Sequence, residues 1–345
     1  MMFDTIFVET DLKKNKRALE IIDTFKSARV KYIDKIEDIF NRVKKPYLQK
    51  NESLNLFLGN KKGQLVKEAP DAYGLSGEPH YYFIHAYNCI YECNYCYLQG
   101  YFNSPDIVVF LNHREICDEI ERVTLDCDKK GLTPWFHAGE FSDSLALTHI
   151  TGELEIYHEL FSRLPQAKLE LRTKSANVKE LLKLPPKENI ITSFSLSPAD
   201  KIQKNDLKTP SLKARLVAIK KLVEAGHKVG IHFDPVVYDN DFKEKYQDLI
   251  NDLFSILPVQ KLEYISVGVI RFTKDVYHQV RKNYPESELL SSELIKSFDG
   301  KIRYNRPMRL WILSAIKELL LEAGVKQEKI YLCMEDDDLE SIAKS

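Results

Sequence analysis

Three cysteines stand close together between residues 89 and 96 of this chain. Cys89, Cys93 and Cys96 follow the spacing C-x3-C-x2-C, with tyrosines between them. Iron–sulfur clusters are held by cysteine thiolates, normally one for each iron. A loop that supplies three thiolates to a four-iron cluster leaves one iron open, as an open position marks a catalytic zinc ion. The spacing therefore indicates a [4Fe–4S] cluster that can bind a further ligand.

The alternative for the same cysteines is a structural zinc site. Zinc sites usually recruit a second pair of Cys or His residues at a defined spacing. The other three cysteines, Cys117, Cys127 and Cys333, are isolated along the chain, and we expect them to be packed residues. Three clustered and three scattered cysteines indicate metal binding in a reducing compartment and not a disulfide framework.

The composition is typical of a cytoplasmic enzyme. The chain has 345 residues, of which 44% are hydrophobic, enough for one large domain with a small companion. Its formal charge of −1 provides no general attraction to nucleic acid, so any such binding must be local. No apolar run is long enough to cross a membrane, and the N-terminus lacks the features of a signal peptide. We expect a monomer that does not associate with membranes.

The cysteine loop needs a scaffold, and the hydrophobic pattern predicts an α/β fold. Residues 1–75 are expected to form a small N-terminal α/β lobe, with strands at 5–8 and 29–33 and a helix at 15–25. From residue 80 onwards, predicted strands alternate with predicted helices. The six strands expected there are 80–85, 133–138, 168–173, 189–197, 228–233 and 262–270.

This alternation predicts βαβ units around a parallel sheet. Crossovers of one hand curve such a sheet towards a barrel. Residues 76–345 are therefore expected to form a partial (β/α)6 barrel with a C-terminal extension. In barrels the chemistry lies at the C-terminal ends of the strands, and the cysteine loop follows the first of the six.

Polar residues follow the later strands at the same end. The segments are Gly139-Glu140 to Asp143 after the second strand, Arg172-Thr173-Lys174 at the third, Ser195 in the fourth, Asp234 after the fifth and Arg271 after the sixth. Because the C-terminal ends of parallel strands meet at the mouth of a barrel, we expect these residues to share one site with the cysteine loop.

The three cysteines have the spacing of the radical S-adenosylmethionine (SAM) enzymes, which the chain resembles. In those enzymes the methionine end of SAM chelates the open iron. One electron then cleaves SAM to a 5′-deoxyadenosyl radical, which abstracts hydrogen from a substrate. Ala138-Gly139-Glu140 is similar to the Gly-Gly-Glu segment that contacts the amino group of SAM. A carboxylate pairs well with an ammonium, and glycine lets the backbone approach the ligand.

The residues around the third cysteine narrow the family. The segment from Cys93 to Gln99 resembles the cluster loop of the spore photoproduct lyase family, whose members reverse a thymine–thymine lesion in spore DNA. Further segments match that family in order along nearly the whole chain. They are Ser142-Asp143, Lys174, Phe194-Ser195, Arg271-Phe272-Thr273-Lys274 and Lys282-Asn283-Tyr284-Pro285.

The resemblance implies roles for individual residues. The cluster would be held by Cys89, Cys93 and Cys96, and SAM would be contacted by Gly139, Glu140, Ser142, Asp143, Lys174 and Ser195. Tyr97 would lie near the adenosyl group, and both Tyr95 and Tyr97 resemble tyrosines implicated in radical relay. The alternative is that the tyrosines only shield the cluster and that Lys174 is a surface lysine at a strand end.

The chain departs from this family at Glu140. Members of the family carry a cysteine here, just before Thr-Ser-Asp, which donates hydrogen to the product radical. An O–H bond of a carboxylic acid is much stronger than an S–H bond, so Glu140 cannot readily replace that donor. We therefore expect a relative whose substrate chemistry differs from that of the lyase.

A basic and aromatic segment at residues 300–309 is the candidate nucleic-acid surface. It contains Arg303, Tyr304 and Arg309, in the region where the family has a Gly-Arg-Tyr-rich segment that contacts damaged DNA. The alternative is a basic turn that caps the following helix, expected at 308–323. The acidic stretch 335–338 would repel phosphate and disfavours a broad nucleic-acid surface.

Three hypotheses remain open at this point. The first is a radical SAM enzyme that acts on DNA as a carbon–carbon lyase in thymine-dimer repair. The second is a radical SAM enzyme that acts on a nucleoside, an RNA or a peptide. The third is a non-enzymatic iron–sulfur or zinc module. Both enzymatic hypotheses require SAM and a reducing electron donor of the flavodoxin or ferredoxin type, and the first adds damaged DNA as a partner.

Overall fold

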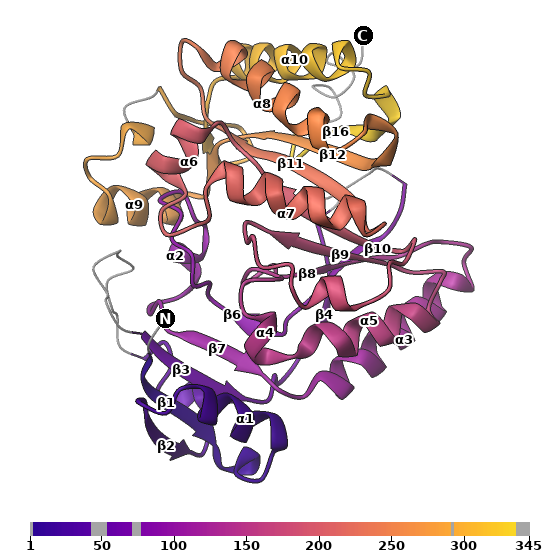
Figure 1. The fold of residues 1–345 in the computed structure, drawn as a ribbon. Coiled ribbons are helices and arrows are strands. Elements are labelled where there is room, and N and C mark those ends of the chain that lie inside the picture. Colours follow the sequence, from indigo (N-terminus) through magenta and orange to yellow (C-terminus); the bar gives the residue numbers. More distant parts are fainter. Residues whose placement is uncertain (1–2, 43–53, 71–76, 291–292, 336–345) are drawn as a thin grey trace.

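The computed structural model describes residues 3–42, 54–70, 77–290 and 293–335. The largest element is a curled sheet of eight strands in the order β16-β12-β11-β10-β9-β8-β5-β4. A sheet of five strands lies beside it and includes the N-terminal part of the chain (Figure 1). The protein is therefore an α/β half-barrel with an N-terminal α/β lobe, as predicted.

Six parallel strands form the centre of the large sheet, in the predicted order. They are β5 (His80–Phe83), β8 (Trp135–Ala138), β9 (Lys168–Thr173), β10 (Ile190–Ser195), β11 (Lys228–Val236) and β12 (Leu262–Val269). A seventh parallel strand, β16 (Ile330–Leu332), pairs with β12, and β4 (Val66–Glu68) runs antiparallel beside β5. The seventh strand brings the C-terminal part of the described chain back to the half-barrel.

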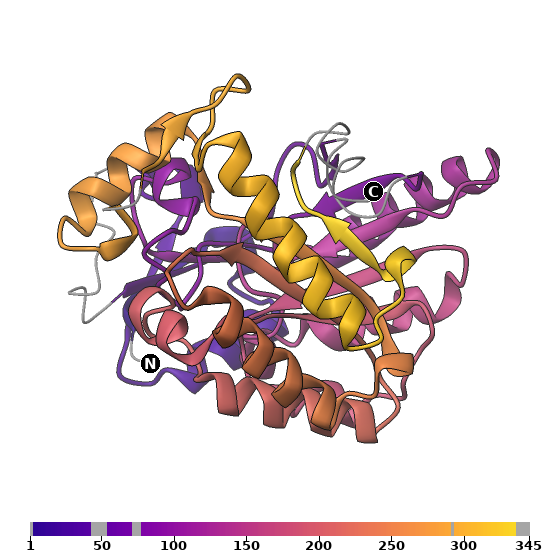
Figure 2. The ribbon, with the colours of Figure 1, turned by 90° about the horizontal axis from the view of Figure 1, so that it is seen from above.

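Helices cover the convex side of this sheet. The larger ones are α3 (His113–Asp128), α5 (Glu153–Arg163), α7 (Leu212–Glu224), α8 (Phe242–Ile256) and α10 (Arg306–Glu322). Figure 2 shows α7, α8 and α10 in succession over the sheet. Each turns an apolar stripe inwards, so that Leu222, Ile250 and Ile316 are buried in one common core.

The concave side of the sheet is polar. On β9, Leu169 and Leu171 belong to the core beneath the helices. Glu170 and Arg172, which alternate with them, form bonds to residues of β11 across the concave side. Successive side chains of a strand point to opposite faces, so this alternation carries polar groups into the half-barrel.

The N-terminal lobe shares strands with the rest of the chain. Its sheet has the order β2-β1-β3-β7-β6. The strands are β1 (Phe3–Glu9), β2 (Arg29–Ile33), β3 (Leu54–Gly59), β7 (Ile107–Phe110) and β6 (Ala86–Tyr87), and α1 (Lys16–Thr24) packs on one face. The sheets therefore exchange strands across residue 75: β4 precedes it but joins the half-barrel, while β6 and β7 follow it but join the lobe.

Shorter elements surround the mouth of the half-barrel. The short helices are α2 (Leu98–Tyr101), α4 (Thr148–Thr151), α6 (Ala199–Asn205) and α9 (Lys274–Asn283). A three-stranded sheet consists of β13 (Arg271–Phe272), β14 (Ile295–Lys296) and β15 (Ile302–Arg303). Within the described ranges, no helix combines the length and the apolar character that a membrane span requires.

Candidate radical SAM site

The three cysteines lie in the loop between β6 and α2. Cys93 is buried, and Cys89 and Cys96 are half-buried. The N–H of Cys96 donates to the carbonyl of Cys93 at 3.0 Å, and the N–H of Tyr91 donates to Cys89 Sγ at 3.4 Å. Burial raises the pKa of Cys89 and of Cys93 well above the ordinary value, and the nearby Cys96 adds to both shifts. The three thiols therefore lie near enough to influence one another's pKa values, one of them buried and two half-buried.

This donor set fits an iron–sulfur cluster. Buried thiols with raised pKa values need a cationic partner to be held as thiolates. A [4Fe–4S] cluster provides that charge and takes one thiolate at each of three irons. In the described part of the chain, no three Cys, His, Asp or Glu side chains are arranged to hold a single metal ion. Three thiols in one loop are the donor set that a [4Fe–4S] cluster with one open iron would use.

Residues between the cysteines tie the loop to segments far along the chain. The N–H groups of Glu92 and Asn94 donate to the carbonyls of Leu207 and Asn205 at 3.0 and 2.9 Å. The phenol of Tyr284 donates to Glu92 Oε1 at 2.7 Å. The conformation of the cysteine loop therefore depends on the α6 and α9 regions, which no local motif reveals.

The turn after β8 brings four predicted cofactor residues together. Gly139 adopts a φ of +83°, and a Cβ at this position would lie 2.6 Å from Ser144 Oγ, so only glycine fits. The N–H of Ser142 donates to the carbonyl of Gly139 at 3.0 Å. The phenol of Tyr97 donates to the carbonyl oxygen of Glu140. The cysteine loop and the Gly-Glu turn are thereby joined directly.

Asp143 holds this turn against β9. Its Oδ1 accepts hydrogen bonds from the N–H groups of Leu145 and Ala146 at 3.0 and 2.9 Å and from Thr173 Oγ1 at 2.6 Å. Its Oδ2 accepts from the N–H of Lys174 at 2.7 Å. These four bonds use the carboxylate to position the backbone on both sides of the site. Its predicted contact with SAM would be additional to this role.

Lys174 stands over Tyr95 beside the cysteine loop. Its Nζ lies 5.6 Å from the centre of the Tyr95 ring, and the phenol of Tyr95 donates to Asp206. Burial lowers the pKa of Lys174, but Cys93 and Asp206 raise it more, so the net shift is upward and the ammonium is charged. The Tyr95 ring therefore lies beneath a half-buried cation.

Ser195 is the last residue of β10. In the sheet, β9, which ends just before Lys174, lies between β10 and β8, the strand that the Gly139–Glu140 turn follows. It is buried, and its carbonyl accepts a hydrogen bond from Arg215 Nη1 at 2.8 Å. Arg215 is fully buried and also donates to Asp206 at 2.9 Å. Neither Arg215 nor Asp206 was predicted as a site residue. A single arginine on the apolar face of α7 is the signal that the sequence offers for them.

The three predicted nucleic-acid residues are buried at the base of the hairpin formed by β14 and β15. Arg303 and Tyr304 have no exposed surface, and Arg309 is 2% exposed. Both arginines bond to Glu335 Oε2, at 3.3 Å from Arg303 Nη1 and 3.1 Å from Arg309 Nε. In this arrangement they hold the hairpin to the C-terminal segment and present no surface to a nucleic acid. Residues 336–338 of the acidic stretch lie outside the described residues.

A buried polar network fills the half-barrel below the mouth. Glu170 accepts hydrogen bonds from Ser193 Oγ at 2.5 Å, Tyr264 at 2.5 Å and His232 Nε2 at 2.7 Å, and it also pairs with His137. The histidines hold the pKa of Glu170 well below its usual range, although burial alone would raise it. These residues form a charged floor beneath the site.

A family profile described as spore photoproduct lyase matches residues 4–306 of the chain. The chain belongs to the spore photoproduct lyase family. Spore photoproduct lyase of Bacillus subtilis is 32% identical over 209 residues, which cover 59% of this chain and 60% of the relative. That of Clostridium acetobutylicum is 23% identical over 220 residues, covering 63% and 65%. The matched region thus spans about 60% of the length of the Bacillus relative.

Solved structures of spore photoproduct lyase share the fold of the whole chain. A variant with bound AdoMet and dinucleoside spore photoproduct is 18% identical and aligns with a TM-score of 0.81 over 97% of this chain and 99% of that one. The lyase complexed with dinucleoside spore photoproduct gives a TM-score of 0.81 at 19% identity, over 96% and 98%. The half-barrel and the N-terminal lobe are therefore those of this family.

Cys333 is buried, as predicted for a packed residue, and it lies beside Arg271 at the mouth of the half-barrel. It follows β16, its N–H donates to the carbonyl of Val267 at 2.8 Å, and Arg271 Nη2 donates to its Sγ at 3.4 Å. Burial and the nearby Asp234 raise the pKa of the thiol to about 11. Since this placement depends on the pairing of β16 with β12, no local pattern predicts it.

Proposed function

We propose that this chain is a radical SAM enzyme that acts on a nucleic-acid lesion of the spore photoproduct type. The observation that carries the proposal is the meeting of the cysteine loop, the Gly139–Glu140 turn and the Lys174 ammonium at one end of the half-barrel. A cluster with a purely structural role has no use for a glycine turn and a half-buried cation beside it. Membership of the spore photoproduct lyase family supports the same assignment.

The proposed roles follow from the chemistry of each side chain. Cys89, Cys93 and Cys96 would each hold one iron of a [4Fe–4S] cluster, which supplies the electron for reductive cleavage of SAM when it is bound. The Glu140 carboxylate suits the amino group of SAM, and the Lys174 ammonium suits its carboxylate. Ser142 and Ser195 would complete the SAM site from the neighbouring turn and strand.

Tyr97 is the proposed catalytic tyrosine. Its side chain is 38% exposed at the site, and its phenol is oriented by the carbonyl of Glu140. Tyr95 is tied to Asp206 beneath Lys174. We therefore propose that Tyr97 faces the substrate and that Tyr95 would position the cation that binds SAM.

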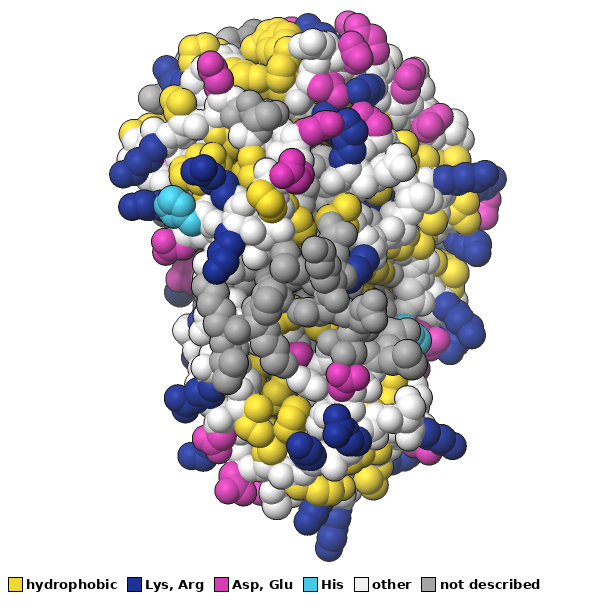
Figure 3. All heavy atoms as spheres, turned by 90° about the vertical axis from the view of Figure 1, so that its left-hand side faces the viewer, with side chains coloured by type: hydrophobic (Ala, Val, Ile, Leu, Met, Phe, Trp, Pro, Cys, Tyr) yellow, Lys and Arg dark blue, Asp and Glu magenta, His cyan; other side chains and the backbone are white. Residues whose placement is uncertain are grey.

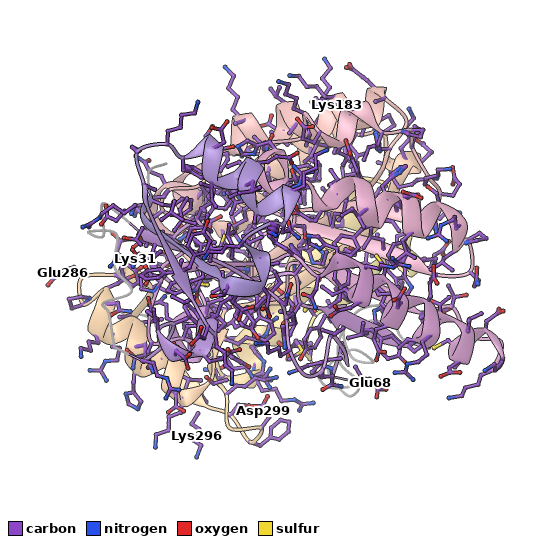
Figure 4. The ribbon with its side chains drawn as sticks, turned by 90° about the horizontal axis from the view of Figure 1, so that it is seen from below. Lys31, Glu68, Lys183, Glu286, Lys296 and Asp299 are labelled. Atoms are coloured by element: carbon purple, nitrogen blue, oxygen red, sulfur yellow. The ribbon has the colours of Figure 1, made fainter. Side chains whose placement is uncertain are left out.

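The tip of the β14–β15 hairpin supports a nucleic-acid substrate. Phe298 is 81% exposed there, and Lys296 and Asp299 reach the edge of the molecule in Figure 4. An exposed aromatic ring suits contact with bases, and Lys296, two residues before it, suits contact with phosphate, although Asp299 beside the ring pairs with Lys301. On the face drawn in Figure 3, by contrast, the described basic side chains are interspersed with acidic ones. We therefore place the nucleic-acid contact at the hairpin tip instead of at Arg303, Tyr304 and Arg309.

A substrate other than DNA is the second candidate. It is favoured by Glu140, which occupies the position where the resemblance leads us to expect a hydrogen-donating thiol. Such an enzyme would use the same cluster and SAM site on a nucleoside, an RNA or a peptide.

The deciding experiment is anaerobic. The cluster is reconstituted, dithionite and SAM are added, and 5′-deoxyadenosine is measured with and without DNA that carries spore photoproduct. Cys93→Ala should lose the iron and the deoxyadenosine, whereas Cys127→Ala, a buried cysteine of α3 outside the loop, should keep both.

Each outcome decides between the hypotheses. Deoxyadenosine together with restored thymine supports lesion repair. Deoxyadenosine without repair favours the second candidate. A well-formed cluster that produces no deoxyadenosine would reject both and support a structural module.

A further inference from the structure

Three aromatic rings lie in contact at the edge of the proposed SAM site. The ring centres of Tyr97 and Tyr101 are 5.6 Å apart, with an angle of 81° between the ring planes. Those of Tyr101 and Phe141 are also 5.6 Å apart, at 66°. Phe141 directly follows Glu140 in the turn after β8, and Tyr97 donates to the carbonyl oxygen of Glu140. We call Tyr97, Tyr101 and Phe141 the aromatic corner.

The outer rings of the aromatic corner are exposed to solvent. Tyr101 is 57% exposed and Tyr97 is 38% exposed, whereas Phe141 is half-buried. Single exposed apolar side chains are common on protein surfaces, but adjacent exposed rings beside a cofactor site indicate a binding surface. Tyr101 is the most accessible of the three rings and therefore the first that a ligand would meet.

Phe141 anchors the aromatic corner in the core below it. Its ring centre lies 6.0, 5.9 and 6.1 Å from those of Tyr82, Tyr87 and Phe102, at angles of 65°, 86° and 71°. Edge-to-face contacts of this kind are a favoured arrangement of aromatic pairs. Phe141 is thereby held in one orientation and supports the exposed ring of Tyr101.

The helix that carries Tyr101 is also held in place. In α2, a Cβ at Gly100 would lie 2.6 Å from Val276 Cγ2 and 3.3 Å from Val276 Cα, so the close approach of α9 requires glycine here. Asn283 Nδ2, also on α9, donates to Gln99 Oε1 at 2.7 Å. The backbone of α2 is therefore fixed before a ligand binds, which lowers the entropy cost of binding.

The charge beside the aromatic corner favours an uncharged ligand. Burial raises the pKa of Tyr82, and the nearby Glu140 and Tyr101 raise it further. The Glu140 carboxylate therefore lies close to these rings and would repel a phosphate. A nucleobase is uncharged and planar, and it stacks on aromatic side chains. Among the parts of a nucleic acid, the base thus suits this surface.

We propose that the aromatic corner binds the base next to the lesion in a nucleic-acid substrate. Tyr97 is the proposed catalytic tyrosine, so Tyr101, the more exposed ring beyond it, is placed to meet a neighbour of the reacting base. Rings at 81° contact a base by stacking and by an edge at the same time. The inference rests on the proposed nucleic-acid function and adds which part of the substrate binds beside the lesion.

The test measures the binding of single-stranded oligonucleotides to cluster-loaded protein with bound SAM and without reductant, so that no turnover occurs. One oligonucleotide carries spore photoproduct between two normal nucleotides, and the other has abasic sugars in their place. Wild-type protein should bind the first about tenfold more tightly, the gain typical of one stacked base. Tyr101→Leu should bring this ratio close to one and leave the affinity for SAM unchanged.

Three further variants control the comparison. Tyr101→Phe retains the ring and should retain the ratio. Tyr32→Leu removes a tyrosine that is 44% exposed on β2 in the N-terminal lobe, and it should also retain the ratio. Phe141→Leu removes the support of Tyr101 and should lower the ratio. It decides the question if Tyr101→Leu does not fold.

The outcomes separate this inference from the proposed function. If wild-type protein binds both oligonucleotides equally, the aromatic corner holds no base, while the nucleic-acid function stands. A tenfold ratio that persists in Tyr101→Leu would assign the neighbouring base to another surface. A loss of SAM affinity, or an equal loss for both oligonucleotides, would show that Tyr101 only supports the SAM site. If neither oligonucleotide binds to wild-type protein, the inference and the proposed function both fail.

Discussion

In two regions of this protein two arginines share one carboxylate, and their hydrogen bonds differ. In the second region, the hairpin base, Arg303 also pairs with Asp299 at 3.1 Å. At the mouth of the half-barrel, Asp234 receives bonds on both oxygens from Arg271 and a longer one from Arg172. At the hairpin base, Glu335 Oε2 is shared by Arg303 and Arg309 at 3.3 and 3.1 Å. The other oxygen, Oε1, is buried without a hydrogen-bond partner among the described residues.

The pKa values of the two carboxyl groups shift in opposite directions. The arginines hold the pKa of Asp234 below its usual range despite burial. Burial raises the pKa of Glu335, and Arg309 and Arg303 do not compensate fully. Glu335, although completely buried, therefore does not form the stronger ion pair with its arginines. Desolvation opposes the Coulomb attraction and must be offset by well-formed hydrogen bonds, which Asp234 has. The accessible mouth can accept a ligand, whereas the hairpin base joins two segments of the chain.

The largest expected effect is at the mouth. Asp234→Asn should lower the free energy of unfolding by about 4 kcal/mol at pH 7, because it removes the buried charge to which both guanidinium groups are bonded. Since the folded pKa of Asp234 lies below the unfolded one, its stabilisation is present at neutral pH and is lost as the pH falls below about 4. Urea unfolding at pH 7 and pH 3.5 measures both effects. Asp252→Asn, on the exposed side of α8, is the control, and a loss below about 1 kcal/mol would contradict the comparison.

The His232 imidazole, which lies near Arg172, should make the free energy of unfolding depend on pH. The pKa of His232 is lowered to about 4, against about 6.5 for an ordinary histidine. Between these values the unfolded chain binds more protons, so the free energy of unfolding should rise with pH by up to about 3 kcal/mol. His232→Gln should remove most of this rise, while His278→Gln, exposed on α9, should leave it. An unchanged pH profile in His232→Gln would show that the ring is not held neutral.

The strands and the cysteine loop were predictable from local pattern. The six central strands alternate with helices, and the C-x3-C-x2-C spacing and the Gly139–Glu140 turn lie at their C-terminal ends, as expected. On β9, the alternation of Glu170 and Arg172 with two leucines also carried a signal for a polar interior. These features depend on residues that are neighbours in sequence.

The pairs that stabilise the mouth and the hairpin base were not predictable. Arg271 meets Cys333 and Arg309 meets Glu335 only because β16 returns to the sheet beside β12. Arg303 is an example, because the sequence predicted a nucleic-acid role for it. A basic residue in a polar segment gives no sign that it is buried against a carboxylate far along the chain. Partners separated by long stretches of chain leave no periodic pattern.

At the hairpin base we expect a smaller effect than at the mouth. Glu335→Gln should lower the free energy of unfolding at pH 7 by about 2 kcal/mol, less than Asp234→Asn, because Arg303 keeps its ion pair with Asp299 at 3.1 Å while Arg309 loses the carboxylate that it bonds. The folded pKa of Glu335 is raised, so the associated stability is present at low pH and is lost as the pH rises through that pKa. Chemical unfolding with Glu328→Gln, an exposed control, measures the change. A loss as large as that of Asp234→Asn would overturn the distinction between the two regions.

The smallest effect on stability is expected at the hairpin tip, beyond this base. Phe298→Ser should change the free energy of unfolding by less than about 0.5 kcal/mol, because Phe298 is 81% exposed and little of its surface is buried in the folded protein. Its affinity for an oligonucleotide carrying spore photoproduct should nevertheless fall about tenfold, the loss typical of one base–aromatic stacking contact. Titration of labelled oligonucleotide at fixed salt, with Leu321→Ser on the exposed side of α10 as the control, separates the two effects. Unchanged affinity would place the nucleic-acid contact elsewhere and leave the mouth as the proposed recognition site.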